Sequence, residues 1–189
     1  MKIDEVKLLK IIEEELNEVM GTYDLRMGKG LSQQPGEYKT PEWDHAISLV
    51  NKAMNMVLRE LSMINENVGS SKEFQAFVFN FETKMKNNSQ LTITSDENLK
   101  EYQGEFRDKT DAVLEVFNLA KSAKEKMNNR FIWVREQGSA GRDSYDKIIR
   151  LLWFVQEVAG KFWGNLSGYV QLYLQEPPEI PKELESGTR

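Results

Sequence analysis

Two long apolar seams constrain the fold of this chain more than any other feature of its sequence. In each seam, large apolar side chains recur at alternating intervals of three and four residues, which places them on one face of an α-helix. The first seam consists of Trp43, Ile47, Val50, Met54, Val57, Leu61 and Ile64. The second consists of Tyr145, Ile148, Leu152, Val155, Ala159, Phe162, Leu166, Tyr169 and Tyr173. Because each seam needs other helices to cover it, the sequence predicts an all-α protein.

Residues at the ends of these seams predict where the helices begin and end. Thr40 and Pro41 have the chemistry of an N-cap and a first helical residue, and Gly69 is expected to end that helix. Asp143 or Ser144 is expected to cap the last helix after a flexible connector at residues 138–141. Pro177 and Pro178 would stop the last helix.

A weaker amphipathic pattern covers residues 4–20. Its apolar positions are Leu9, Ile12, Leu16 and Val19, and its other face carries Glu13, Glu14, Glu15 and Glu18. The pattern predicts an acidic helix. Residues 21–39 are rich in glycine and predict a long loop, which in compact domains is usually functional or disordered.

Two further segments are open to more than one interpretation. Ser70 and Glu73 have capping-box spacing and favour a helix, whereas the alternation of Phe77, Phe79 and Phe81 is typical of a β-hairpin at residues 76–94. The helix is the favoured interpretation. An apolar stripe over residues 96–137 predicts a helix near 60 Å long, at about 1.5 Å per residue. That length exceeds a compact domain, so this helix either breaks or projects.

The expected architecture is an antiparallel bundle of four to five helices in which the second, fourth and fifth are long. With 189 residues, of which 40% are hydrophobic, the chain can form one domain with a substantial core. We expect that domain at residues 1–176. Residues 177–189 are expected to form a polar, poorly ordered tail.

Cysteine and histidine usage excludes several kinds of chemistry. The chain has no cysteine, which rules out disulfides, thiol nucleophiles and zinc sites of the cysteine type. Its one histidine, His45, has no apparent nucleophile as a partner. We expect no cofactor. The longest uncharged run of the last helix, residues 162–174, is shorter than the roughly 20 residues of a membrane span, so a cytoplasmic protein without membrane contact is expected.

Two pairs of carboxylates are weak candidates for a metal site. Glu15 and Glu18 stand three residues apart, as do Glu105 and Asp108, and two such pairs on facing helices could hold magnesium for an all-α hydrolase. The favoured interpretation is that these side chains lie on solvated helix faces. No metal site is therefore predicted.

Three glycines in the last helix are spaced by four residues. Gly160, Gly164 and Gly168 would share one side of the helix, where they allow another helix to approach closely. A contact within the bundle is favoured. A contact between two copies, or membrane insertion after a conformational change, is the alternative.

The net charge of -5 conceals a basic segment between the last two long helices. Residues 121–150 carry eight basic and four acidic side chains, a local charge of +4, and aromatic residues lie among them. Such a patch suits RNA or single-stranded DNA. Its candidate residues are Arg130, Trp133, Arg135, Arg142, Lys147 and Arg150. The competing interpretation is that Phe131 and Trp153 belong to the core and the basic residues only solvate a helical hairpin.

The absence of a catalytic constellation favours a non-enzymatic function. We expect a subunit, adaptor or inhibitor that acts through protein–protein contacts, with a protein partner or a second copy of itself. Nucleic-acid binding is the first alternative and the magnesium-dependent hydrolase is the second.

Overall fold

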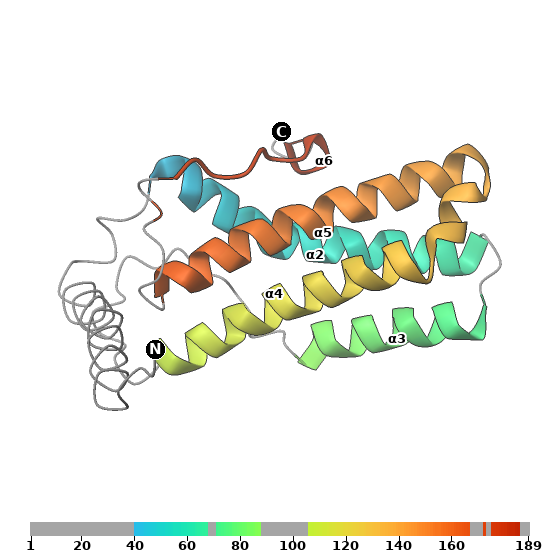
Figure 1. The fold of residues 1–189 in the computed structure, drawn as a ribbon, viewed down its shortest axis with the longest axis horizontal. Coiled ribbons are helices and arrows are strands. Elements are labelled where there is room, and N and C mark those ends of the chain that lie inside the picture. The colour runs from blue at the N-terminus through green and yellow to red at the C-terminus, as the bar shows by residue number, and fades with distance from the viewer. Residues whose placement is uncertain (1–39, 68–70, 88–105, 167–171, 173–174, 186–189) are drawn as a thin grey trace, which may run out of the picture.

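The structure is a computed structural model that describes residues 40–67, 71–87, 106–166, 172 and 175–185. Four long helices form most of this described part. They are α2 (Pro41–Asn67), α3 (Lys72–Asn87), α4 (Phe106–Asn129) and α5 (Gly138–Leu166). A 3₁₀ helix, η2 (Ile132–Glu136), lies between α4 and α5, and a short α6 (Lys182–Glu185) follows near the C-terminus. Successive long helices run in opposite directions (Figure 1). The predicted all-α antiparallel bundle is confirmed.

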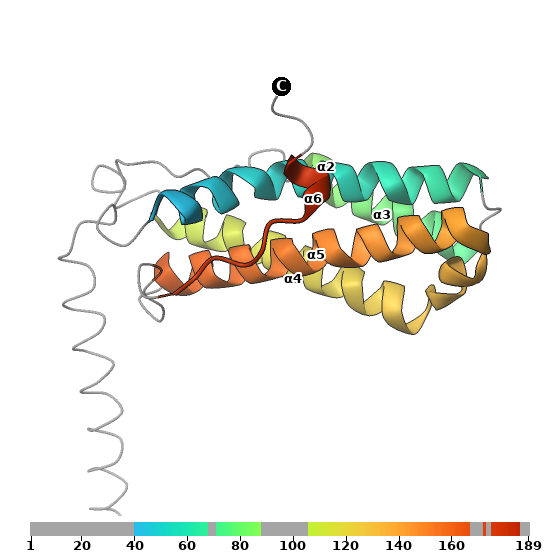
Figure 2. The ribbon, with the colours of Figure 1, turned by 90° about the horizontal axis from the view of Figure 1, so that it is seen from above.

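α5 has the most extensive packing in the bundle. It packs against α2, α4 and η2, while α2 also contacts α3 and α6, and α3 contacts α4. Figure 2 shows the long helices side by side, with the chain of residues 175–185 crossing over α5 to reach α2. The two seams explain this arrangement, because every residue of the first seam and every described residue of the second is buried.

α2 begins as the sequence predicts. The Trp43 backbone N–H donates a hydrogen bond of 3.3 Å to Oγ1 of Thr40, and Pro41 takes the first helical position. The buried alanines Ala46 and Ala53 allow close packing on a second side of the helix. This explains how α2 contacts three other helices.

The segment that could form a helix or a hairpin is helical over residues 72–87. Residues 72–87 form one α-helix, so the hairpin is wrong over residues 76–87, and residues 88–94 lie outside the described part. The cap is Ser71 and not Ser70, because Oγ of Ser71 accepts a hydrogen bond of 3.2 Å from the Phe74 N–H. Phe77 and Phe81 are buried, but Phe79 is 67% exposed.

The long fourth helix breaks and does not project. The N–H groups of Arg130 and Phe131 both donate to the Lys126 carbonyl, and the chain then continues as η2. At the break the Phe131 ring lies in the core, 5.0 Å from the ring centroid of Phe74 and 5.1 Å from that of Phe77.

The beginning of α5 differs from the prediction. Residues 138–141 form its first turn and not a flexible connector, and neither Asp143 nor Ser144 is its N-cap. Gly138 has φ of +73°, a conformation that side chains disfavour. A Cβ on Gly141 would lie 2.4 Å from the Val134 carbonyl oxygen. Glycine is therefore required where α5 meets η2.

The expected polar tail instead packs on the bundle over residues 175–185. The Trp43 indole N–H donates a hydrogen bond of 2.7 Å to the Gln175 carbonyl, and Nζ of Lys52 donates one of 2.7 Å to the Leu184 carbonyl. Leu184 is buried, and Ile180 packs partly against the core. We call residues 175–185 the C-terminal strap.

Some expectations lie outside the described residues. They are the acidic helix at 4–20, the loop at 21–39, Gly168, Tyr169, Tyr173 and the end of the last helix. Within the described ranges, no helix has both the length and the apolar composition that a membrane span requires.

Candidate functional site

The predicted basic patch is largely paired with carboxylates. Four of its five cationic side chains form ion pairs. They are Arg130 with Glu73 at 2.7 Å, Arg135 with Asp146 at 3.3 Å, Lys147 with Glu60 at 2.6 Å, and Arg150 with Glu183. Arg142 is exposed near the beginning of α5. The local charge of +4, which already counts Asp146, is therefore reduced by acids that come from α2, α3 and the C-terminal strap.

Aromatic residues of the predicted patch do not form one exposed surface. Phe131 is buried, as the competing interpretation expected. Trp133 is half-buried, and its ring lies 5.8 Å from that of Phe74. Trp153 is 45% exposed, so its assignment to the core is wrong. Base stacking on this surface would rest mainly on Trp153, which lies apart from Trp133 along the chain.

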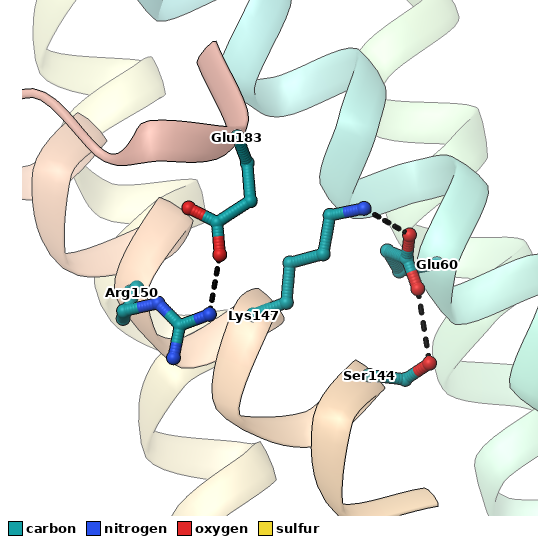
Figure 3. A network of polar contacts seen from close by, with 5 residues as sticks. All are labelled: Glu60, Ser144, Lys147, Arg150 and Glu183. Atoms are coloured by element: carbon teal, nitrogen blue, oxygen red, sulfur yellow. Dashed lines mark hydrogen bonds and ion pairs between the residues drawn. The ribbon is translucent and has the colours of Figure 1, made fainter. Parts of the chain in front are cut away.

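One buried carboxylate joins α2 to α5. Glu60 is 7% exposed, and its two oxygens accept hydrogen bonds from Oγ of Ser144 at 3.0 Å and Nζ of Lys147 at 2.6 Å (Figure 3). A charge at this depth needs such partners, because water cannot solvate it. Lys147 therefore stabilises the bundle and is not free to bind a phosphate.

A second ion pair joins α5 to the C-terminal strap. Arg150 donates to the Glu183 carboxylate, and Figure 3 shows this pair beside the one formed by Lys147. Burial raises the pKa of the Glu183 carboxyl. The hydrogen bond from Arg150 and the positive charge of that side chain lower it by more, so the pKa of Glu183 lies below its ordinary value. The ionised carboxylate thus helps to hold the strap on the bundle.

A groove lies between α4, α5 and the C-terminal strap. Its volume is about 630 Å³. α4 contributes Lys124 and Asn128, α5 contributes Ile149, Arg150 and Trp153, and residues 179–183 form the opposite wall. We call it the Trp153 groove.

Ile149 and Trp153 give the lining an apolar part, here called the floor, and the charged side chains of α4 and the C-terminal strap are here called the walls. Ile149 and Trp153 stand four residues apart and so share one face of α5. Lys124 on one wall and Lys182 on the other form no ion pair with a described residue, whereas Arg150 is paired with Glu183. An aromatic side chain that remains nearly half exposed above apolar neighbours is typical of a binding surface.

Asn128 is held in place at the edge of the groove. Its Oδ1 accepts a hydrogen bond of 2.9 Å from the Tyr145 hydroxyl. Burial raises the pKa of Tyr145, Arg135 opposes that rise, and Asp146 adds to it. Tyr145 thus keeps its proton and positions Asn128 as a wall residue.

The other predicted site residues are not brought together. Glu15, Glu18 and Glu105 lie outside the described part, and Asp108 belongs to the first turn of α4. No group of three potential metal ligands occurs among the described residues. His45 is exposed on α2.

Gly160 packs inside the bundle. A Cβ at this position would lie 3.1 Å from Cε2 of Phe117 on α4, and Gly164 is also buried. This part of the glycine pattern contributes to a contact between α4 and α5 of the same chain.

Comparison of the chain with protein-family models, with curated proteins and with solved structures found no match.

The Trp153 groove was missed because its wall comes from residues 179–183. The sequence holds one indication of it. Ile149 and Trp153 form a second apolar line beside the main seam of α5, which uses Ile148, Leu152 and Val155. An apolar line outside the seam indicates either a further intramolecular contact or a binding surface.

Proposed function

We propose that this protein is a non-enzymatic helical bundle that binds a protein partner through the Trp153 groove. The observation that carries the proposal is the 45% exposure of Trp153 within a groove of about 630 Å³. Binding energy in protein interfaces is concentrated in aromatic and arginine side chains near the centre of the contact, with charged groups at the rim. A lining of Trp153 and Ile149 together with Lys124 and Lys182 has this composition.

Rigid support for the groove favours the same function. Its floor belongs to the most extensively packed helix, and its outer wall is held by the Arg150–Glu183 pair, the Lys52 hydrogen bond and buried Leu184. A surface fixed before binding loses less conformational entropy when a partner arrives.

Site-specific crosslinking in the source cells tests the proposal. The photoreactive residue p-benzoylphenylalanine would replace Trp153 in one full-length variant and Phe79 in the control. Phe79 is 67% exposed on α3, so both probes are accessible. We expect a discrete protein adduct at position 153 that is absent at position 79.

Reconstitution with the identified partner completes the test. Trp153→Ala should weaken binding at least tenfold, as for a central interface aromatic, while Phe79→Ala should leave it unchanged. Equal binding by both variants would refute the proposal. A nucleic-acid adduct at 153 would instead support the RNA or single-stranded DNA alternative, and metal-dependent turnover would support the hydrolase.

A further inference from the structure

The Trp153 groove has a charge pattern that an acidic amphipathic helix would complement. Lys124 and Lys182 line the groove from α4 and from the C-terminal strap and form no ion pair with a described residue, and they outnumber the exposed acid Glu179 of the same lining, since Glu183 is paired with Arg150. Between them lies the apolar floor of Ile149 and Trp153. A complementary ligand would bring an apolar stripe to the floor and one carboxylate to each wall.

Residues 4–20 of this chain have that pattern. At about 100° per residue, the seam of Leu9, Ile12, Leu16 and Val19 has a common centre on the predicted helix. Glu13 and Glu15 lie about 80° to either side of that centre. The two glutamates therefore flank the apolar seam in the way that Lys124 and Lys182 flank the floor.

The connection to α2 is long enough to reach the groove. Trp43, in the first turn of α2, contacts the Gln175 carbonyl, and Ile180 of the groove wall is only five residues further along the strap. Five residues span at most about 18 Å, whereas residues 21–40 can span about 65 Å. A tether of this kind gives an effective concentration in the millimolar range, so weak contacts suffice.

We propose that residues 4–20 bind as a helix in the Trp153 groove of the same molecule. This inference rests on the proposed function of the groove as a protein-binding site. Glu13 and Glu15 pair with the wall lysines, and the seam covers Trp153.

The absence of cysteine from the chain permits a direct test. Leu16→Cys and Glu179→Cys are introduced together in the full-length protein and treated with a short bismaleimide crosslinker. The control pair is Leu16→Cys with Asn80→Cys, because Asn80 is exposed on α3. Peptide mapping distinguishes crosslinks within a chain from crosslinks between chains. We expect crosslinking of 16 to 179 within one chain, about tenfold faster than of 16 to 80.

Charge reversal makes the test specific for the proposed pairing. Lys124→Glu with Lys182→Glu should slow the 16–179 reaction about tenfold, and adding Glu13→Lys with Glu15→Lys should restore it. An unchanged unfolding midpoint confirms that each variant folds. The inference is overturned if the two cysteine pairs react at the same rate, or if charge reversal leaves the 16–179 rate unchanged. Crosslinking that occurs only between chains also overturns it and would identify a second copy as the occupant. A partner adduct at position 153 together with any of these results would leave the proposed function standing.

Discussion

Removing Lys147 alone should destabilise the bundle more than removing both members of its ion pair. Lys147→Met leaves the Glu60 carboxylate 7% exposed with only the Ser144 hydroxyl as a donor. Breaking a buried pair typically costs 3–5 kcal/mol, and about 2–3 kcal/mol is expected here because 27% of the Lys147 side chain is already exposed to water.

Replacing both partners removes the uncompensated charge. The double variant Glu60→Met with Lys147→Met should lie within about 1 kcal/mol of the unsubstituted protein, because apolar side chains of similar volume can replace a buried pair with little loss. Glu60→Met alone should cost about 1 kcal/mol, since the freed lysine can extend to solvent. With a cost of about 1 kcal/mol for the double variant, the cycle therefore predicts a coupling of about 2–3 kcal/mol.

Urea unfolding followed by circular dichroism measures all four proteins, and Arg130→Met provides the matched control. Arg130 and Glu73 are 66% and 59% exposed, so their pair should contribute less than about 1 kcal/mol. In thermal unfolding, Lys147→Met should lower the midpoint by about 5–10 °C. If Lys147→Met cost no more than Arg130→Met, the reasoning from burial would be refuted.

Two further predictions concern the first turn of α5 and the attachment of the C-terminal strap to the bundle. Gly141→Ala should lower the free energy of unfolding by about 1–3 kcal/mol, because its Cβ meets the Val134 carbonyl at 2.4 Å; an unchanged urea midpoint would contradict this. The pKa of Glu183 is lowered in the folded protein, so its stabilising contribution is present above the unfolded pKa and is lost as the pH falls through the folded pKa. Limited proteolysis should accordingly release the strap faster in acid, and Arg150→Gln should abolish much of that pH dependence.

Helical periodicity predicted the parts of this fold that depend on neighbours along the chain. The Thr40 cap and the seams of α2 and α5 required only residues three and four apart, and the structure confirms the cap, the α2 seam and the α5 seam from Tyr145 to Leu166. The break after α4 could not be predicted in this way. At this break Phe131 packs against Phe74 and Phe77, which lie more than fifty residues earlier in the chain, a contact that local periodicity does not contain.

The candidate site was less predictable than the fold because charge pairing is a tertiary property. A count of basic residues over 121–150 suggested an open cationic patch, but Glu60 and Glu183 come from distant segments and pair with Lys147 and Arg150. The same strap that neutralises Arg150 also forms the wall of the groove beside Trp153. Packing of residues 175–185 therefore changes the chemistry of this surface in two ways. It weakens the electrostatic argument for nucleic acid, and it creates a groove with an aromatic floor, which is better suited to an apolar helix than to a phosphate backbone.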